Sequence, residues 1–190
     1  MTPLQPTAEL RALVRGRAEQ FTSVPADLAS ARQQLVRIEQ EELLAVMVQS
    51  YQAYQANIDA LHRTAHTLAY DAARKAVEAV LLAMGVRISR VGGHHTTVAA
   101  AEAVLLPPPP SRRRNALSFA RARNVRHEDE YPRPTTQSGV TLREWREQTQ
   151  NCVRLVSDCR ELLGLDRIDE LVPTDHRLGE WTPPAARPRP

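Results

Sequence analysis

The stretch HTLAYDAARKAVEAVLLAMGVRI, residues 66–88, decides the fold of this chain. Large apolar and small residues recur along it at three- and four-residue spacing, which is typical of an amphipathic helix: Tyr70, Ala73, Val77, Val80, Leu81 and Met84. We expect Thr64 or Thr67 to cap this helix and Gly85 to end it, because glycine readily adopts the left-handed conformation that follows a last helical turn.

The same reasoning predicts helices before this stretch. Residues 7–21 show a short helical pattern with Thr7 as its cap. Pro25 then stands at the first turn of a long helical stretch that continues to His62 without glycine or proline. One long helix, or two helices broken near residues 49–54, fits the spacing of the apolar residues.

Three further helices follow, and no segment shows a convincing strand pattern. Residues 86–95 read as a loop, residues 96–106 as a short helix, and Pro107 to Pro110 as an extended polyproline segment. A helix restarts near Asn115 and ends at or before Tyr131, because Pro132 follows. Thr141 and Glu144 form a capping box that opens a last helix, which Gly164 ends.

The predicted fold class is therefore all-α, an antiparallel helical bundle. We expect three parts: an N-terminal helical arm in residues 1–25, the bundle in residues 26–164, and an irregular proline-rich tail in residues 165–190. Aromatic residues make up only 4% of the chain, so the core should consist of Ala, Leu and Val side chains.

The composition favours a reduced, cytoplasmic protein. No stretch approaches the roughly 20 apolar residues of a membrane span, and no secretory signal is visible. Cys152 and Cys159 are seven residues apart in one helical pattern, too far along a helix to bridge each other. We expect both thiols to be buried; an intermolecular disulfide is the alternative. Lys75 is the only lysine, so the basic surface is formed by guanidinium groups, which suit bidentate phosphate contacts.

The stretch ARARNVRHEDEY, residues 120–131, carries the strongest candidate for chemistry. Arg123 and His127 are i, i+4 neighbours on a helix, whereas Arg121 meets His127 only if the helix loosens. Histidine can take and give a proton near neutral pH, and a guanidinium can hold a phosphate and oppose its developing charge. These groups suffice to cleave RNA without a metal. The alternative is an ordinary helix end with Arg126 and Glu130 paired at i, i+4.

Two other basic segments could support this motif. His94 and His95 follow a glycine pair and lack nearby Cys, Asp or Glu at metal-ligand spacing, so a subsidiary substrate contact is a better functional reading than a metal site. The alternative is a pair of polar loop residues. Arg112, Arg113 and Arg114 form a basic patch that either contacts an RNA backbone or is a solvated helix start.

His62 and His66 are i, i+4 neighbours but lack the glutamate of a zinc-protease motif, so a buried, hydrogen-bonded or interface role is favoured. The chain has no phosphate-binding GxxxxGK motif, no GxSxG motif and no paired CxxC motif. We therefore expect no metal and no cofactor.

Residues 66–88, followed by a shorter helix, ARARNVRHEDEY and a last long helix, resemble a HEPN domain over about residues 50–164. The HEPN signature is an arginine, often followed by a polar residue, with a histidine four to six residues further on. Arg121 meets the spacing, while Arg123 with Asn124 supplies the arginine–polar step, so the arginine of the motif maps onto either. The resemblance implies a helical homodimer and a metal-independent endoribonuclease, with Asn124, Arg126 and the basic segments contacting RNA.

Small HEPN proteins of actinobacteria are the members that the chain resembles most, and toxin members have a tyrosine two residues after the histidine. An antitoxin adenylylates that tyrosine. Here the nearest tyrosine is Tyr131, four residues after His127, and it is the candidate for modification. The resemblance thus implies a toxin or phage-defence effector with a nucleotidyltransferase antitoxin. The alternative is an inactive HEPN-like scaffold that dimerises and binds RNA, a nucleotide or a partner protein.

Overall fold

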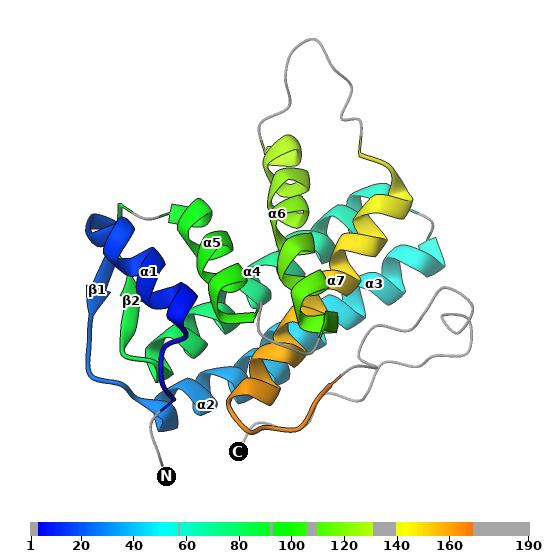
Figure 1. Cartoon of the computed structure of the whole chain (residues 1–190). Coiled ribbons are helices and arrows are strands. Elements are labelled where there is room, and N and C mark those ends of the chain that lie inside the picture. The colour runs from blue at the N-terminus through cyan, green and yellow to red at the C-terminus, as the bar shows by residue number, and fades with distance from the viewer. Residues whose placement is uncertain (1–3, 57, 92, 106–109, 131–139, 169–190) are drawn as a thin grey trace.

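The computed structural model describes residues 4–56, 58–91, 93–105, 110–130 and 140–168 (Figure 1). Its α-helices are α1 (Ala8–Gly16), α2 (Leu28–Arg37), α3 (Leu44–Ala56), α4 (Asp59–Ala83), α5 (Gly93–Leu105), α6 (Pro110–Glu130) and α7 (Leu142–Leu162). A 3-10 turn, η1 (Ala18–Gln20), precedes strand β1 (Phe21–Ser23), and a π-helical turn, η2 (Ile38–Leu43), joins α2 to α3. Strand β2 (Val86–Ile88) follows α4. The predicted all-α bundle is confirmed.

Helix α4 is the centre of the bundle, with α2, α3, α5, α6 and α7 all packed against it. Its buried residues form one broad face of the helix, and seven of them are alanines: Ala65, Ala69, Ala72, Ala73, Ala76, Ala79 and Ala83. Because alanine side chains are short, neighbouring helices can approach this face of α4 closely. The core is accordingly rich in Ala, Leu and Val.

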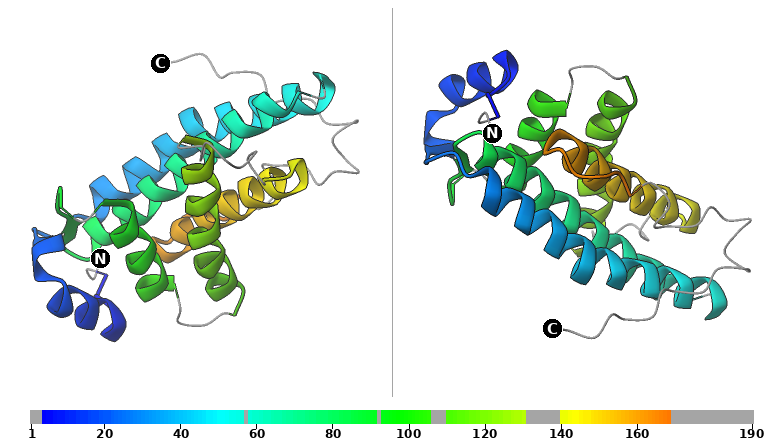
Figure 2. Two further views of the ribbon diagram at one scale, coloured as in Figure 1. Left: turned by 90° about the horizontal axis from the view of Figure 1, so that it is seen from above. Right: turned by 90° about the horizontal axis from the view of Figure 1, so that it is seen from below.

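Helices α2, α3 and α7 lie along α4, and α5 and α6 pack across it (Figure 2). The rod formed by α2, η2 and α3 lies along one side and runs antiparallel to α4, with α7 on the other side. Helix α6 runs antiparallel to α7, since Asn115 near its start bonds to Asp158 and Arg121 further along bonds to Glu144. Helix α5 packs against α6, and α1 covers α5. No helix in these described ranges is both long and apolar enough to cross a bilayer.

Several predicted helix boundaries were wrong. Helix α4 begins at Asp59, before Thr64 and Thr67, so the preceding break lies near Ile58 and not within residues 49–54. Helix α2 starts at Leu28 and is capped by Asp27, whose Oδ1 accepts a hydrogen bond from the Ser30 N–H at 2.9 Å. Apolar spacing continues through both regions, and it does not reveal where backbone hydrogen bonding stops.

Helices α5 and α6 also start earlier than predicted. Helix α5 begins at Gly93, which places His94 and His95 in its first turn and not in a loop. Helix α6 begins at Pro110, a position where the missing proline N–H costs nothing. Residues 107–109 of the predicted polyproline segment lie outside the described residues.

The prediction that the chain has no strand was also wrong. Residues 21–23 and 86–88 form a two-stranded antiparallel ribbon with Phe21 opposite Ile88 and Ser23 opposite Val86. Each strand has only three residues, too few for an alternating pattern to stand out in the sequence. The ribbon ties the segment before α2 to the segment after α4.

The predicted caps are confirmed at both ends of the chain. Thr7 accepts a hydrogen bond from the Leu10 N–H at 3.0 Å, and Thr141 accepts one from the Glu144 N–H at 3.2 Å. Gly164 ends α7 with a φ of 70°. The predicted tail falls mostly on residues 169–190, which lie outside the described residues.

Replacement of Gly85 by alanine should destabilise the fold. Gly85 has a φ of +75°, and a Cβ there would lie 3.0 Å from the Val24 carbonyl oxygen. A left-handed conformation costs a residue with a Cβ about 1–2 kcal/mol, and the close approach adds to that cost. Urea denaturation of Gly85→Ala should therefore show a free energy of unfolding at least about 1 kcal/mol below wild type.

Gly16 provides the matched control. It is the last residue of α1, and a Cβ added to it would meet no atom within 4 Å. Gly16→Ala should leave stability unchanged or raise it by up to about 1 kcal/mol, because alanine favours helix more than glycine does. Equal destabilisation by the two substitutions would contradict this account of Gly85.

Candidate active site

The motif arginines lie on different sides of α6. The helix continues without interruption to Glu130, so it does not loosen between Arg121 and His127. At 3.6 residues per turn, Arg123 and His127 are about 40° apart around the axis, whereas Arg121 and His127 are about 120° apart. Arg121 bonds to Glu144 of α7. The geometry therefore places Arg123, and not Arg121, on the same side of the helix as His127.

Arg123 is held by two neighbours. One of its terminal nitrogens contacts Nδ1 of His95 on α5, and the other donates to the Asn124 side-chain oxygen at 2.7 Å. The tertiary structure thus brings together a guanidinium from α6 and an imidazole from α5, 28 residues apart in sequence. His95, Asn124 and His127 are all exposed, so a solvent-borne ligand can reach this group.

A second layer of contacts lies beneath Arg123. Tyr70 on α4 is fully buried, and its hydroxyl group lies 3.1 Å from Nδ1 of His94. The Tyr70 ring stacks on Phe119. The Arg126 guanidinium lies over the Tyr70 ring, 5.1 Å from the ring centroid. Arg126 also pairs with Asp71. These contacts join α4, α5 and α6 below the exposed cluster, and they fix the positions of His94 and Arg126.

Burial suppresses ionisation of Tyr70 in this layer. Burial raises the pKa of Tyr70 well above its ordinary value, so its hydroxyl group stays protonated. Burial likewise raises the pKa of Cys152 and of Cys159, and both thiols are buried, as predicted. Neutral thiols in an apolar core are inert, which assigns these cysteines to packing and not to catalysis.

The basic patch near the start of α6 is remote from the motif. Arg112 to His127 spans 15 residues of helix, or about 22 Å at 1.5 Å per residue. Arg112 pairs with Glu161 at 2.9 Å and is largely covered, whereas Arg113 and Arg114 are exposed. The structure therefore does not bring this patch together with His127.

Tyr131 lies outside the described residues, and so do the side chains of residues 128–130. Among the described residues, no group of three or more His, Cys, Asp and Glu side chains could hold a metal ion.

Sequence reasoning missed the part that α4 plays in this site. The spacing of apolar residues places Tyr70 in the apolar stripe, and Asp71 belongs to no sequence motif. The signal available was a tyrosine–aspartate step in a helix that is otherwise rich in alanine. Only the approach of α5 and α6 reveals that both residues support the site.

Both His62 and His66 are buried, as predicted, but the predicted hydrogen bonding is wrong for His66. His62 lies 3.5 Å from an Arg146 nitrogen, a long contact, and is 5% exposed. His66 is fully buried, and neither of its ring nitrogens has a hydrogen-bond partner within the described part of the chain. Burial, with a smaller contribution from Arg126, lowers the pKa of His66 from its ordinary value of 6.5 to about 4.

Comparisons with known proteins add no relative. The chain matches no protein-family model, and no curated protein sequence or solved structure is significantly similar to it.

His66 should make the fold sensitive to acid. Above pH 6.5 the imidazole is neutral in both states; as the pH falls from 6.5 toward 4, the unfolded chain takes up a proton that the folded chain does not. Stability is lost over that window, by about 2 kcal/mol between pH 7.5 and pH 5. His66→Leu should remove this loss.

Urea denaturation of both proteins at the two pH values measures the difference. His127→Leu serves as the control, because it removes an exposed imidazole and leaves the buried one in place. If wild type and His66→Leu lose the same stability between pH 7.5 and pH 5, the burial of His66 is not the cause.

Proposed function

We propose that this chain is a metal-independent endoribonuclease of the HEPN type, with Arg123, His95 and His127 as its catalytic residues. The observation that carries the proposal is the contact between Arg123 of α6 and His95 of α5. Arg123 lies one helical turn before His127, and both histidines are exposed. A phosphate bound by the guanidinium would have an imidazole on each of two helices within its neighbourhood. Asn124 supports the role by orienting Arg123.

The reaction requires a base, an acid and a cation. One imidazole takes the proton of a ribose 2′-hydroxyl group, and the 2′-oxygen attacks the adjacent phosphorus. Arg123 donates hydrogen bonds to the non-bridging oxygens, where negative charge accumulates. The bond from phosphorus to the 5′-oxygen breaks, and the other imidazole gives that oxygen a proton. The products are a 2′,3′-cyclic phosphate and a 5′-hydroxyl end.

The wider proposal follows from the resemblance to HEPN domains. The protein would act in the cytoplasm as a toxin or phage-defence effector, as a homodimer, under the control of a nucleotidyltransferase antitoxin. Two buried free thiols are in keeping with a reducing compartment. The inactive scaffold remains the competing proposal, and it predicts binding of RNA without cleavage.

Cleavage of labelled RNA in the presence of EDTA tests the catalytic assignment. Wild type should cleave despite the chelator, while His127→Ala and Arg123→Ala should each lose at least about 100-fold in rate, the usual cost of removing an acid–base group or a charge-stabilising donor. Arg121→Ala is the matched control. It removes the same charge from the other side of α6 and should stay within a few-fold of wild type.

Two results would contradict the assignment. Loss of activity in Arg121→Ala with retention in Arg123→Ala would show that the arginine is wrongly chosen. Binding of RNA without any cleavage by wild type would favour the scaffold. Circular dichroism of each variant excludes unfolding as the cause of a loss.

His95→Ala distinguishes two sources of the second imidazole. If His95 supplies it, the rate should fall by about 100-fold while RNA binding persists, because the acid–base couple is incomplete. Full activity in His95→Ala alongside an inactive His127→Ala would instead require a second histidine from another copy of the chain. Light scattering of the active species then establishes whether it is a dimer.

A further inference from the structure

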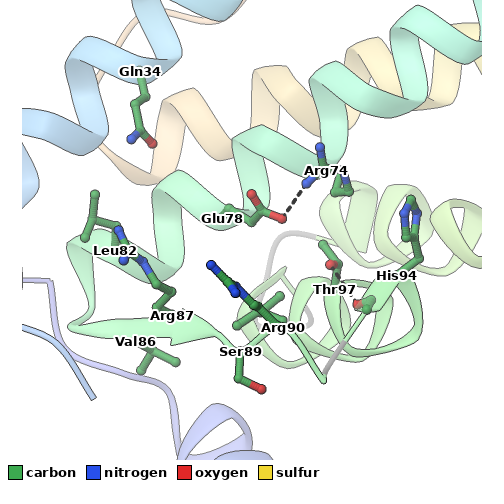
Figure 3. A pocket seen from close by; sticks show the side chains of 12 residues that line it. Gln34, Arg74, Glu78, Leu82, Val86, Arg87, Ser89, Arg90, His94 and Thr97 are labelled. Carbon is green, nitrogen blue, oxygen red and sulfur yellow. Dashed lines mark hydrogen bonds and ion pairs between the residues drawn. The ribbon is translucent and has the colours of Figure 1, made fainter. Parts of the chain in front are cut away.

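A cavity of about 470 Å³ lies beside the candidate active site, where β2 and the start of α5 meet α4 (Figure 3). Figure 3 shows Arg74 and Glu78 reaching it from α4, and Arg87 and Arg90 from β2 and the residues after it. Its volume falls within the range of about 300–1,000 Å³ that is usual for small-molecule sites.

The lining of the cavity carries a net positive charge. Three guanidinium groups, those of Arg74, Arg87 and Arg90, face one carboxylate, that of Glu78. Arg74 is fixed by Glu78 at 2.7 Å, and Asp71 lies 3.7 Å away. The guanidinium groups of Arg87 and Arg90 form no hydrogen bond or ion pair with any residue that the structure describes. Two cations without partners at one cavity favour an anionic ligand.

The backbone that carries these two arginines is held in place. Arg87 is the middle residue of β2 and lies opposite Thr22 of β1. The following Ser89 donates its N–H to the Gln20 carbonyl oxygen at 2.9 Å and its hydroxyl group to the Glu19 carbonyl oxygen at 2.8 Å. Strand β2 and the residues after it thus present Arg87 and Arg90 to the cavity from a fixed stretch of backbone. A backbone that is already ordered loses less entropy when a ligand binds.

The rest of the lining suits a ligand with an apolar or planar part as well as an anionic group. Leu82, Val86 and Ile88 contribute apolar surface, while Thr97 and Gln34 offer polar groups. Guanidinium groups bind phosphate in a bidentate manner, and the cavity is much larger than a phosphate ion requires. The lining therefore fits a phosphate ester whose organic part is about the size of a nucleoside.

We propose that this cavity binds the phosphate monoester of a nucleotide-sized ligand through Arg87 and Arg90, with Arg74 as a third cation. The ligand is either a free ribonucleotide or the 5′-phosphorylated end of an RNA. His94 lines the cavity and contacts Tyr70, and the next residue, His95, contacts Arg123, so the cavity borders the candidate active site. Binding here requires no RNA cleavage.

Isothermal titration of the full chain carrying His127→Ala tests the proposal separately from cleavage. The four ribonucleoside 5′-monophosphates should bind, and the matching nucleosides should bind at least tenfold more weakly. The double variant Arg87→Ala/Arg90→Ala should lose at least tenfold in affinity for the monophosphates. Arg143→Ala/Arg154→Ala removes the same charge from exposed positions on α7 and should stay within about twofold.

A second titration distinguishes the two ligand sources. A short RNA with a 5′-phosphate is compared with the same RNA carrying a 5′-hydroxyl group. A preference for the phosphorylated RNA that depends on Arg87 and Arg90 identifies an RNA end, whereas such dependence for monophosphates alone identifies a free nucleotide. If neither ligand class binds with this dependence, or if both double variants lose affinity equally, the proposal is overturned.

Discussion

The burial of one broad face of α4 is the constraint on which the rest of the structure depends. Five helices pack on α4, and the alanines of its second half allow them to approach at short distances. Tyr70, Asp71 and Arg74 lie where α5 and α6 approach α4. The candidate active site and the neighbouring cavity both form over these three residues.

The contacts of Tyr70 and Asp71 link the core to the exposed chemistry. Tyr70 stacks on Phe119 of α6 and meets His94 of α5, while Asp71 pairs with Arg126. These buried and half-buried contacts fix α5 against α6, and that packing brings His95 to Arg123. Glu144 and Glu161 engage Arg121 and Arg112 elsewhere along α6. Arg123 of α6, by contrast, is set against the imidazole of His95 on α5.

The sequence could predict the helices because their signals are local. Thr7, Thr141 and Gly164 act within a single turn, and each was correctly assigned. The start of α4 was misplaced because apolar spacing runs on through Ile58, and the ribbon was missed because it pairs two three-residue segments 65 residues apart. The choice between Arg121 and Arg123 was open for a similar reason: it depends on which helix packs against each face of α6.

By itself, the sequence determined an all-α bundle, a core of small aliphatic residues and an arginine–histidine motif near the end of a helix. These properties follow from composition and from spacing within one helix, where neighbours three or four residues apart must share a face. Only the tertiary structure decided that Arg123 faces His95, that His66 is sealed from solvent, and that Arg87 and Arg90 line a cavity. Such pairings join distant segments, and helix packing sets them because each helix has several faces that a partner could cover.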